Sequence, residues 1–188
     1  MGLIFEALAR AGQLDNTLLI FTSDNGCLMG EHGQFGQKRW ACEESIRIPF
    51  LVRDPKRIPA GSSREQMSLS VDVAPAAVEL AGAGALGPMH GRSLLPVFRD
   101  DAAPLSDSFL AGHFVGKGAP KAPDWQAVRT GQWKYIHDPA LEGMDELYDL
   151  RADPREIRHL ASDAAQAELV GRVRGELSRR LESTGRPG

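Results

Sequence analysis

The sequence has few cysteines, no strong charge bias and no long apolar run, and each absence argues against a class of protein. Its two cysteines, Cys27 and Cys42, are too few for a disulfide framework and lack the spacing of a zinc site. The net charge of -3 offers no basic footprint, so no nucleic-acid partner is expected. No run approaches the roughly 20 apolar residues that span a membrane, so no membrane span is expected either.

No signal peptide is expected at the start of this sequence. Met1 leads directly into Gly-Leu-Ile-Phe-Glu, without the basic residues that open a signal peptide. Localisation therefore stays open between cytoplasmic and periplasmic or secreted. With 188 residues the chain is long enough for one sizeable core, or for a core with a small appendage.

The first half of the chain alternates between helix and strand patterns. Residues 3–11 place apolar side chains on one face and are followed by Gly12, which is typical of a helix and its C-terminal glycine. Short apolar strands are predicted at 17–22 and 48–52. The first is typical of a strand buried on both faces, as in a parallel sheet. A second helix is predicted within 67–81, with Asp72 as a capping or core-bonding residue.

The second half has a different pattern, and a polar stretch at 99–104 indicates the boundary. Strands are predicted at 108–115, 125–130, 133–137 and 146–150, with a tight hairpin at Gly131-Gln132 between the second and third. An amphipathic helix is predicted at 164–181. A sheet with one helix across it is an α+β arrangement.

The most informative stretch follows the first predicted strand. The strand ends at Ser-Asp-Asn-Gly, so Asp24 and Asn25 stand side by side at its carboxyl end. Ligands of open α/β sheets bind at that edge, and the side-chain oxygens of both residues suit Ca²⁺ or Mg²⁺. A glycine-rich loop with Glu31 and His32 then leads to Lys38 and Arg39. A cation site with basic residues close behind suits an oxyanion ester.

Several strings together resemble one family. SDNG, GEHG, a lysine followed by EESIRIP, then GRSLLP, VRTGQWKYIHD and DELYDLRADPRE resemble the C-terminal half of a type I sulfatase. The resemblance implies an α/β fold of the alkaline-phosphatase-like superfamily. Residues 1–99 would form the C-terminal part of a parallel-sheet catalytic domain. Residues 100–188 would form a small α+β subdomain, an antiparallel sheet with one helix.

The resemblance also implies residue roles. Asp24 and Asn25 would complete a metal site, usually for calcium, with Mg²⁺ or Mn²⁺ as alternatives. Lys38 would contact the substrate sulfate as the catalytic lysine. The loop before Lys38 is about one residue longer than the family pattern, so either Lys38 or Arg39 could hold the sulfate. His32 and His113 are further candidates for substrate binding, although His113 also reads as a structural residue at a strand end.

The implied nucleophile is absent from the sequence. Sulfatases use a formylglycine made from the Cys or Ser of a C/S-x-P/A-x-R segment, and the sequence contains no such segment. The predicted function is therefore a sulfatase fragment, inactive on its own, whose partners are a missing N-terminal half and a sulfate ester or sulfated glycan. Two alternatives stay open: a phosphodiester or phosphonate hydrolase of the same superfamily, and a non-enzymatic remnant.

Overall fold

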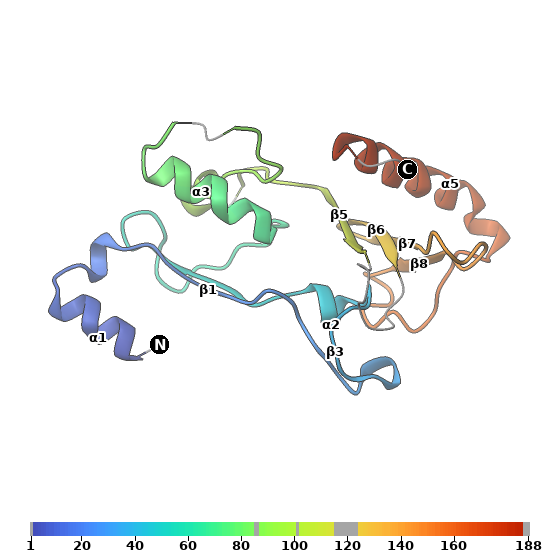
Figure 1. Cartoon of the computed structure of the whole chain (residues 1–188), viewed down its shortest axis with the longest axis horizontal. Helices are drawn as coiled ribbons and strands as arrows, with labels where there is room; N and C mark the ends of the chain where they lie inside the picture. Colours follow the sequence, from blue (N-terminus) through green and yellow to red (C-terminus); the bar gives the residue numbers. More distant parts are fainter. Residues whose placement is uncertain (1, 85–86, 101, 115–123, 186–188) are drawn as a thin grey trace. The chain divides into compact units, whose positions relative to one another are not determined.

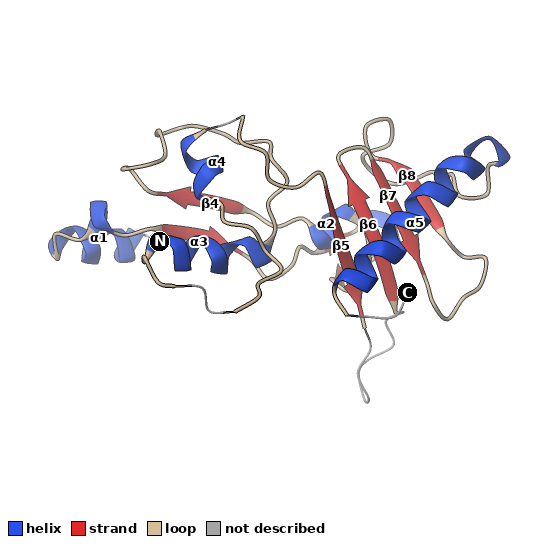
Figure 2. Cartoon of the chain, turned by 90° about the horizontal axis from the view of Figure 1, so that it is seen from above, coloured by secondary structure: helices blue, strands red, loops and turns tan. Residues whose placement is uncertain are grey.

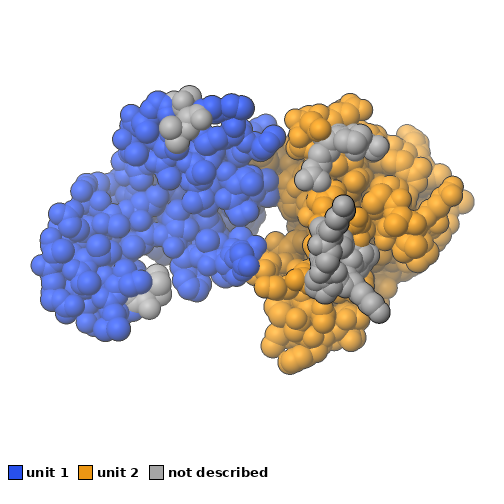
Figure 3. Space-filling model, in the orientation of Figure 1, with its two compact units in different colours: residues 1–24, 48–105 blue, residues 25–47, 106–188 orange. Residues whose placement is uncertain are grey.

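The computed structural model describes residues 2–84, 87–100, 102–114 and 124–185. The chain divides into two compact units (Figure 3). Unit 1 comprises residues 1–24 and 48–105, and unit 2 comprises residues 25–47 and 106–188. The segment that carries most of the predicted site residues, 25–47, therefore folds with the C-terminal part of the chain.

Unit 1 contains a two-stranded antiparallel sheet. Its strands are β1 (Leu19–Thr22) and β4 (Phe50–Arg53), and helix α1 (Gly2–Arg10) and a 3-10 turn (Leu14–Asn16) precede them (Figure 1). The sequence predicts a first strand buried on both faces beside parallel neighbours. Within the described residues, β1 instead pairs antiparallel with β4, and Phe21 opposite Leu51 leaves one face exposed. The other face, where Val52 lies, packs on the core of the unit.

The core of unit 1 lies between that sheet and two helices. Helix α3 (Val73–Leu80) follows a 3-10 turn (Ser70–Asp72), and a further short helix, α4 (Leu95–Arg99), follows it along the chain. Proline is tolerated in the first turn of a helix, which explains how Pro96 lies within α4. The predicted role of Asp72 is confirmed, because its buried carboxylate accepts the N–H groups of Leu69 and Arg92, each at 2.8 Å.

Unit 2 is built on a four-stranded antiparallel sheet with one helix across it (Figure 2). This confirms the predicted α+β arrangement, and the predicted hairpin joins the second strand to the third. Val115, the last residue of the first predicted strand, lies outside the described residues. In sheet order the elements are β5 (Ser108–His113), β6 (Trp125–Thr130), β7 (Trp133–His137) and β8 (Glu146–Asp149), followed by a 3-10 turn (Ala164–Gln166) and α5 (Ala167–Ser183).

Alternation along the strands separates the two faces of this sheet. On one face, Val128, Tyr135 and Leu147 pack with the apolar stripe of α5, which includes Leu177. The opposite face is covered by segment 25–47, whose Ala41 packs against the strands. That segment contains a hairpin of β2 (Leu28–Met29) and β3 (Phe35–Gln37), a 3-10 turn (Glu31–Gly33) and the short helix α2 (Glu43–Ile46).

We predict that Leu177→Ala destabilises unit 2, because Leu177 is 3% exposed at the centre of the α5 contact. Truncation of a buried leucine costs about 2–5 kcal/mol of unfolding free energy. The matched control is Arg172→Ala on the exposed face of α5, for which a change within about 0.5 kcal/mol is expected. Urea unfolding measures both, and equal effects would contradict the packing described.

Candidate functional site

The segment after β1 is held to helix α2 through a glycine. The Gly26 N–H donates to the Ser45 carbonyl at 2.8 Å. A Cβ atom at Gly26 would lie 2.0 Å from the Glu44 carbonyl oxygen and 2.6 Å from that of Arg47. Only glycine permits so close a backbone approach. The location of Asn25 is therefore coupled directly to α2.

Asp24 and Asn25 offer oxygen atoms directly after the strand. Asp24 is exposed, and its Oδ1 accepts a hydrogen bond from the Ser23 hydroxyl at 3.3 Å. Asn25 is half-buried and donates through Nδ2 to the Gly26 carbonyl at 2.6 Å. Because the amide nitrogen makes this bond, Oδ1 is the Asn25 atom suited to a cation.

The other predicted site residues are spread over unit 2. His32 has a left-handed backbone (φ 52°), and its Nε2 lies 3.6 Å from Glu44 Oε2, so the structure pairs it with α2. Lys38 and Arg39 are exposed and directly follow β3. His113 ends β5 opposite Trp125. Their roles in binding remain predictions.

A buried ionic cluster, which the sequence patterns do not predict, contacts the segment that follows Lys38 and Arg39. Lys134, on β7, is fully buried, and its Nζ contacts a carboxylate oxygen of Glu156 and lies 3.4 Å from Glu43 Oε1. Glu43 also pairs with Arg129 of β6 at 3.2 Å. The ammonium donates to the Ala41 carbonyl at 2.6 Å. Strand alternation could have placed Lys134 on the face away from α5, but not its partners.

Burial changes the pKa of Glu156, in this cluster, and of the nearby Cys42. It raises the pKa of Glu156, while the ammonium of Lys134 acts in the opposite direction. Burial and nearby carboxylates also raise the pKa of Cys42 to about 11, so the thiol is protonated at neutral pH. Ligand atoms of His32, Cys42 and Glu156 lie within 4.8 Å of one another. Because the Glu156 carboxylate is already paired with Lys134, we assign Glu156 a structural role.

A second polar cluster lies at the other end of β7. Asp145 accepts hydrogen bonds from the Tyr135 hydroxyl at 2.6 Å and from Arg174 of α5 at 2.5 Å, and His137 Nδ1 lies 2.7 Å away. Burial by itself raises the pKa of Asp145. These three partners outweigh it and hold the pKa below its ordinary value. The cluster fixes the loop before β8 to α5.

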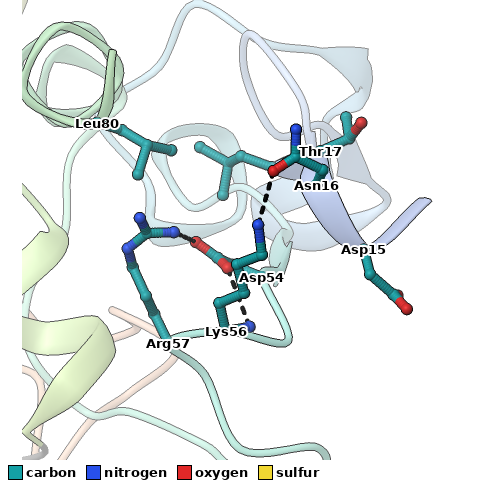
Figure 4. A pocket seen from close by; sticks show the side chains of 8 residues that line it. Asp15, Asn16, Thr17, Asp54, Lys56, Arg57 and Leu80 are labelled. Carbon is teal, nitrogen blue, oxygen red and sulfur yellow. Dashed lines mark hydrogen bonds and ion pairs between the residues drawn. The ribbon is translucent and has the colours of Figure 1, made fainter. Parts of the chain in front are cut away.

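Unit 1 has a small polar pocket, which Figure 4 shows. Lys56 donates to the Asn16 side chain at 2.6 Å, and Arg57 pairs with Asp54 at 2.7 Å. Arg57 is thus paired with a carboxylate of the pocket itself, and Lys56 is hydrogen-bonded to a neutral amide. None of the predicted site residues lines this pocket.

Comparison with known proteins identifies the family. A family model for the C-terminal region of N-sulphoglucosamine sulphohydrolase matches residues 30–183. N-acetylglucosamine-6-O-sulfatase from Bacteroides thetaiotaomicron is 34% identical over 187 residues, which is 98% of this chain and 33% of that protein.

Two solved structures extend the match. The structure of BT4656 with its substrate D-glucosamine-2-N,6-O-disulfate superimposes with a TM-score of 0.88 at 31% identity, covering 96% of this chain and 37% of that one. The phosphonate monoester hydrolase of Agrobacterium radiobacter gives 0.81 at 30% identity, with 96% and 38% covered.

The chain belongs to the sulfatase family of the alkaline-phosphatase-like superfamily and corresponds to its C-terminal part. It spans about a third of the length of the curated relatives it matches. Within the described residues, no helix is long and apolar enough to cross a bilayer.

We predict that Gly26→Ala destabilises unit 2 because the added methyl group collides with the backbone of α2. Overpacking of this kind costs about 1–3 kcal/mol of unfolding free energy. Gly131→Ala is the matched control, since a Cβ there meets nothing within 4 Å. Urea unfolding compares the two variants. An unchanged unfolding free energy for Gly26→Ala would show that the close approach of Gly26 to α2 is not required.

We further predict a pH-dependent effect of Asp145→Asn. Because the folded-state pKa of Asp145 is lowered, its contribution is present above the ordinary value and is lost as pH falls through the folded value. At pH 7 the variant should lose about 2 kcal/mol of unfolding free energy, as for hydrogen bonds to a charged group. The difference from the parent should shrink in acid. Asp107→Asn, at an exposed position, should show no such trend.

Proposed function

We propose that the chain supplies the sulfate-binding lysine and two metal ligands of a sulfatase that acts on O-sulfated amino sugars. The observation that carries the proposal is the exposed Lys38 in a segment whose backbone is bonded to the sheet at the next residue, Arg39. The substrate class is supported by the names of two relatives, one an N-acetylglucosamine-6-O-sulfatase and one bound to a disulfated glucosamine.

In this proposal Lys38 neutralises negative charge on the non-bridging oxygens of the sulfate ester. A preorganised cation at that location stabilises the transition state of sulfate transfer more strongly than the ground state. This difference lowers the activation barrier. Arg39 and His32 lie in the same segment and are the neighbouring candidates for the substrate rim, with His113 as a further one.

The oxygen atoms of Asp24 and Asn25 fit a hard divalent cation, for which calcium is our first choice and Mg²⁺ or Mn²⁺ the alternatives. Such a cation would polarise the sulfate ester. Two ligands fall well short of the six to eight that calcium takes, so this chain alone should bind it weakly. The remaining ligands and the formylglycine would come from the N-terminal part of the family fold, because the sequence has no C/S-x-P/A-x-R segment.

The domain assignment is part of the proposal. Residues 1–99 would complete the catalytic α/β domain, and residues 100–188 would form the α+β subdomain, one face of whose sheet is covered by segment 25–47.

The alternative reaction is hydrolysis of a phosphonate or phosphodiester. The likeness to the Agrobacterium radiobacter phosphonate monoester hydrolase supports it. An oxyanion site built from a lysine and a divalent cation suits either tetrahedral group, so the substrate must be assigned by assay.

The test is a chimera in which this chain replaces the matching C-terminal third of the Bacteroides thetaiotaomicron sulfatase. We expect the chimera to hydrolyse N-acetylglucosamine 6-sulfate. Lys38→Ala should lower kcat/KM by roughly 10²-fold or more, as loss of a preorganised donor does. The matched control, Lys56→Ala, removes a lysine of unit 1 that lies outside the proposed site.

The outcomes separate the possibilities. A loss below about threefold for Lys38→Ala, with a large loss for Arg39→Ala, would move the role to Arg39. Faster turnover of a phenyl phosphonate monoester than of the sulfate ester would favour the alternative reaction. A folded chimera without activity on either substrate would contradict the proposal.

A further inference from the structure

Three side chains of unit 2, two from its four-stranded sheet and one from the turn after β8, bond to the main chain of alternate residues just after Lys38. The Trp125 indole N–H donates to the Arg39 carbonyl at 2.8 Å. The Lys134 ammonium donates to the Ala41 carbonyl at 2.6 Å. Glu156 accepts the N–H of Glu43 at 2.7 Å.

These anchor residues (Trp125, Lys134 and Glu156) come from two strands and from the turn after β8. All three are buried, with at most 7% of each exposed. They bind backbone atoms, so they fix the path of the segment whatever its side chains are. The bonds fall at Arg39, Ala41 and Glu43, along the bends that lead from β3 into α2.

The energetic cost of burying the Lys134–Glu156 ion pair indicates that this pair has a role besides stabilising the fold. Burying an ammonium and a carboxylate costs several kcal/mol each, and apolar replacements of such pairs are often neutral or stabilising. Glu156 also has a left-handed backbone (φ 54°), which is uncommon for a residue other than glycine. Residues with a strained backbone conformation of this kind are concentrated at functional sites.

The anchored segment leads directly to the proposed metal ligand. Glu43 begins α2, and the Ser45 carbonyl of α2 accepts the Gly26 N–H. Asn25 is the preceding residue. The anchor residues therefore act on both ends of the proposed site within unit 2: on Lys38 through Arg39, and on Asn25 through α2 and Gly26.

We infer that Trp125, Lys134 and Glu156 are positioning residues, through which the C-terminal sheet holds Lys38 and Asn25 in place for an oxyanion ester. The inference rests on the proposed function for the roles of Lys38 and Asn25, whereas the coupling itself is a property of the fold.

The test is amide hydrogen exchange on the whole chain, which needs no activity. Glu156→Gln keeps the shape of the side chain but removes its charge. The readout is the Gly26 amide together with those of Ser45 and Arg47, none of which is bonded to Glu156. We expect their exchange to rise roughly tenfold or more beyond the rise at amides between β6 and β7, which report the general loss of stability of the sheet.

Leu177→Ala is the matched control, because it destabilises the same sheet from the α5 side. It should raise exchange throughout β6 and β7 without selective effect on Gly26. Trp125→Phe removes one indole bond and keeps an aromatic ring. It should raise exchange at residues 40–47 selectively, and it preserves the test if Glu156→Gln does not fold.

The inference is overturned if both anchor variants leave the Gly26 amide unchanged, or if they raise exchange uniformly as Leu177→Ala does. In the chimera, Trp125→Phe should lower kcat/KM at least fivefold with its Tm close to that of the parent chimera. An inactive parent chimera would refute the proposed function alone, since the exchange result stands apart from activity.

Discussion

The structure of unit 2 depends on one buried ammonium. Lys134 lies on an inner strand with no exposed surface, and its charge is balanced by Glu156 and Glu43. Removal of one member of such a group leaves an uncompensated buried charge, which typically costs about 3–5 kcal/mol. The arrangement therefore tolerates little displacement. Hydrogen bonds to defined backbone atoms hold the residues after Lys38 against the sheet.

This constraint connects the sheet to the proposed chemistry. One face of the sheet is covered by α5 mainly through an apolar contact, to which Arg174 of α5 adds bonds to Tyr135 and Asp145. The other face uses charged and polar groups on main-chain atoms, in addition to a small apolar cluster. Apolar contacts resist sliding only weakly, whereas hydrogen bonds to particular carbonyl and N–H groups define a register. A site that must hold a lysine in place gains from the second kind of contact.

Much of this fold could be predicted from the sequence, because its patterns are local. Alternating strands, the hairpin at Gly131-Gln132 and the stripe of α5 follow from side-chain periodicity. Asp72 could also be predicted as a capping or core-bonding residue of the helix expected within 67–81. Lys134 could not be predicted in the same way. In the string WKYIH a lysine between aromatic residues reads as the solvent face of a strand, and only Ala41, 93 residues away, shows that this face is covered.

The first strand shows the opposite case. Its apolar run predicts burial on both faces, yet Phe21 is 43% and Leu51 63% exposed. Within the described residues β1 has one neighbouring strand, β4, and the chain spans about a third of the relatives it matches. The candidate site also depends on parts of the chain that are distant in sequence. Motif strings indicated Asp24, Asn25 and Lys38, but the residues that hold their segment lie far away in sequence.

The dependence of unit 2 on the buried ammonium is tested most directly by a double-mutant cycle between Lys134→Met and Glu156→Gln, with unfolding free energies from urea titration. Because the two side chains share one buried ion pair, each single variant should be strongly destabilised. The double variant should recover part of that loss, with a coupling energy of about 1–3 kcal/mol. Additive effects within about 0.5 kcal/mol would show that the two side chains act independently, and would contradict the central role of the Lys134 ammonium.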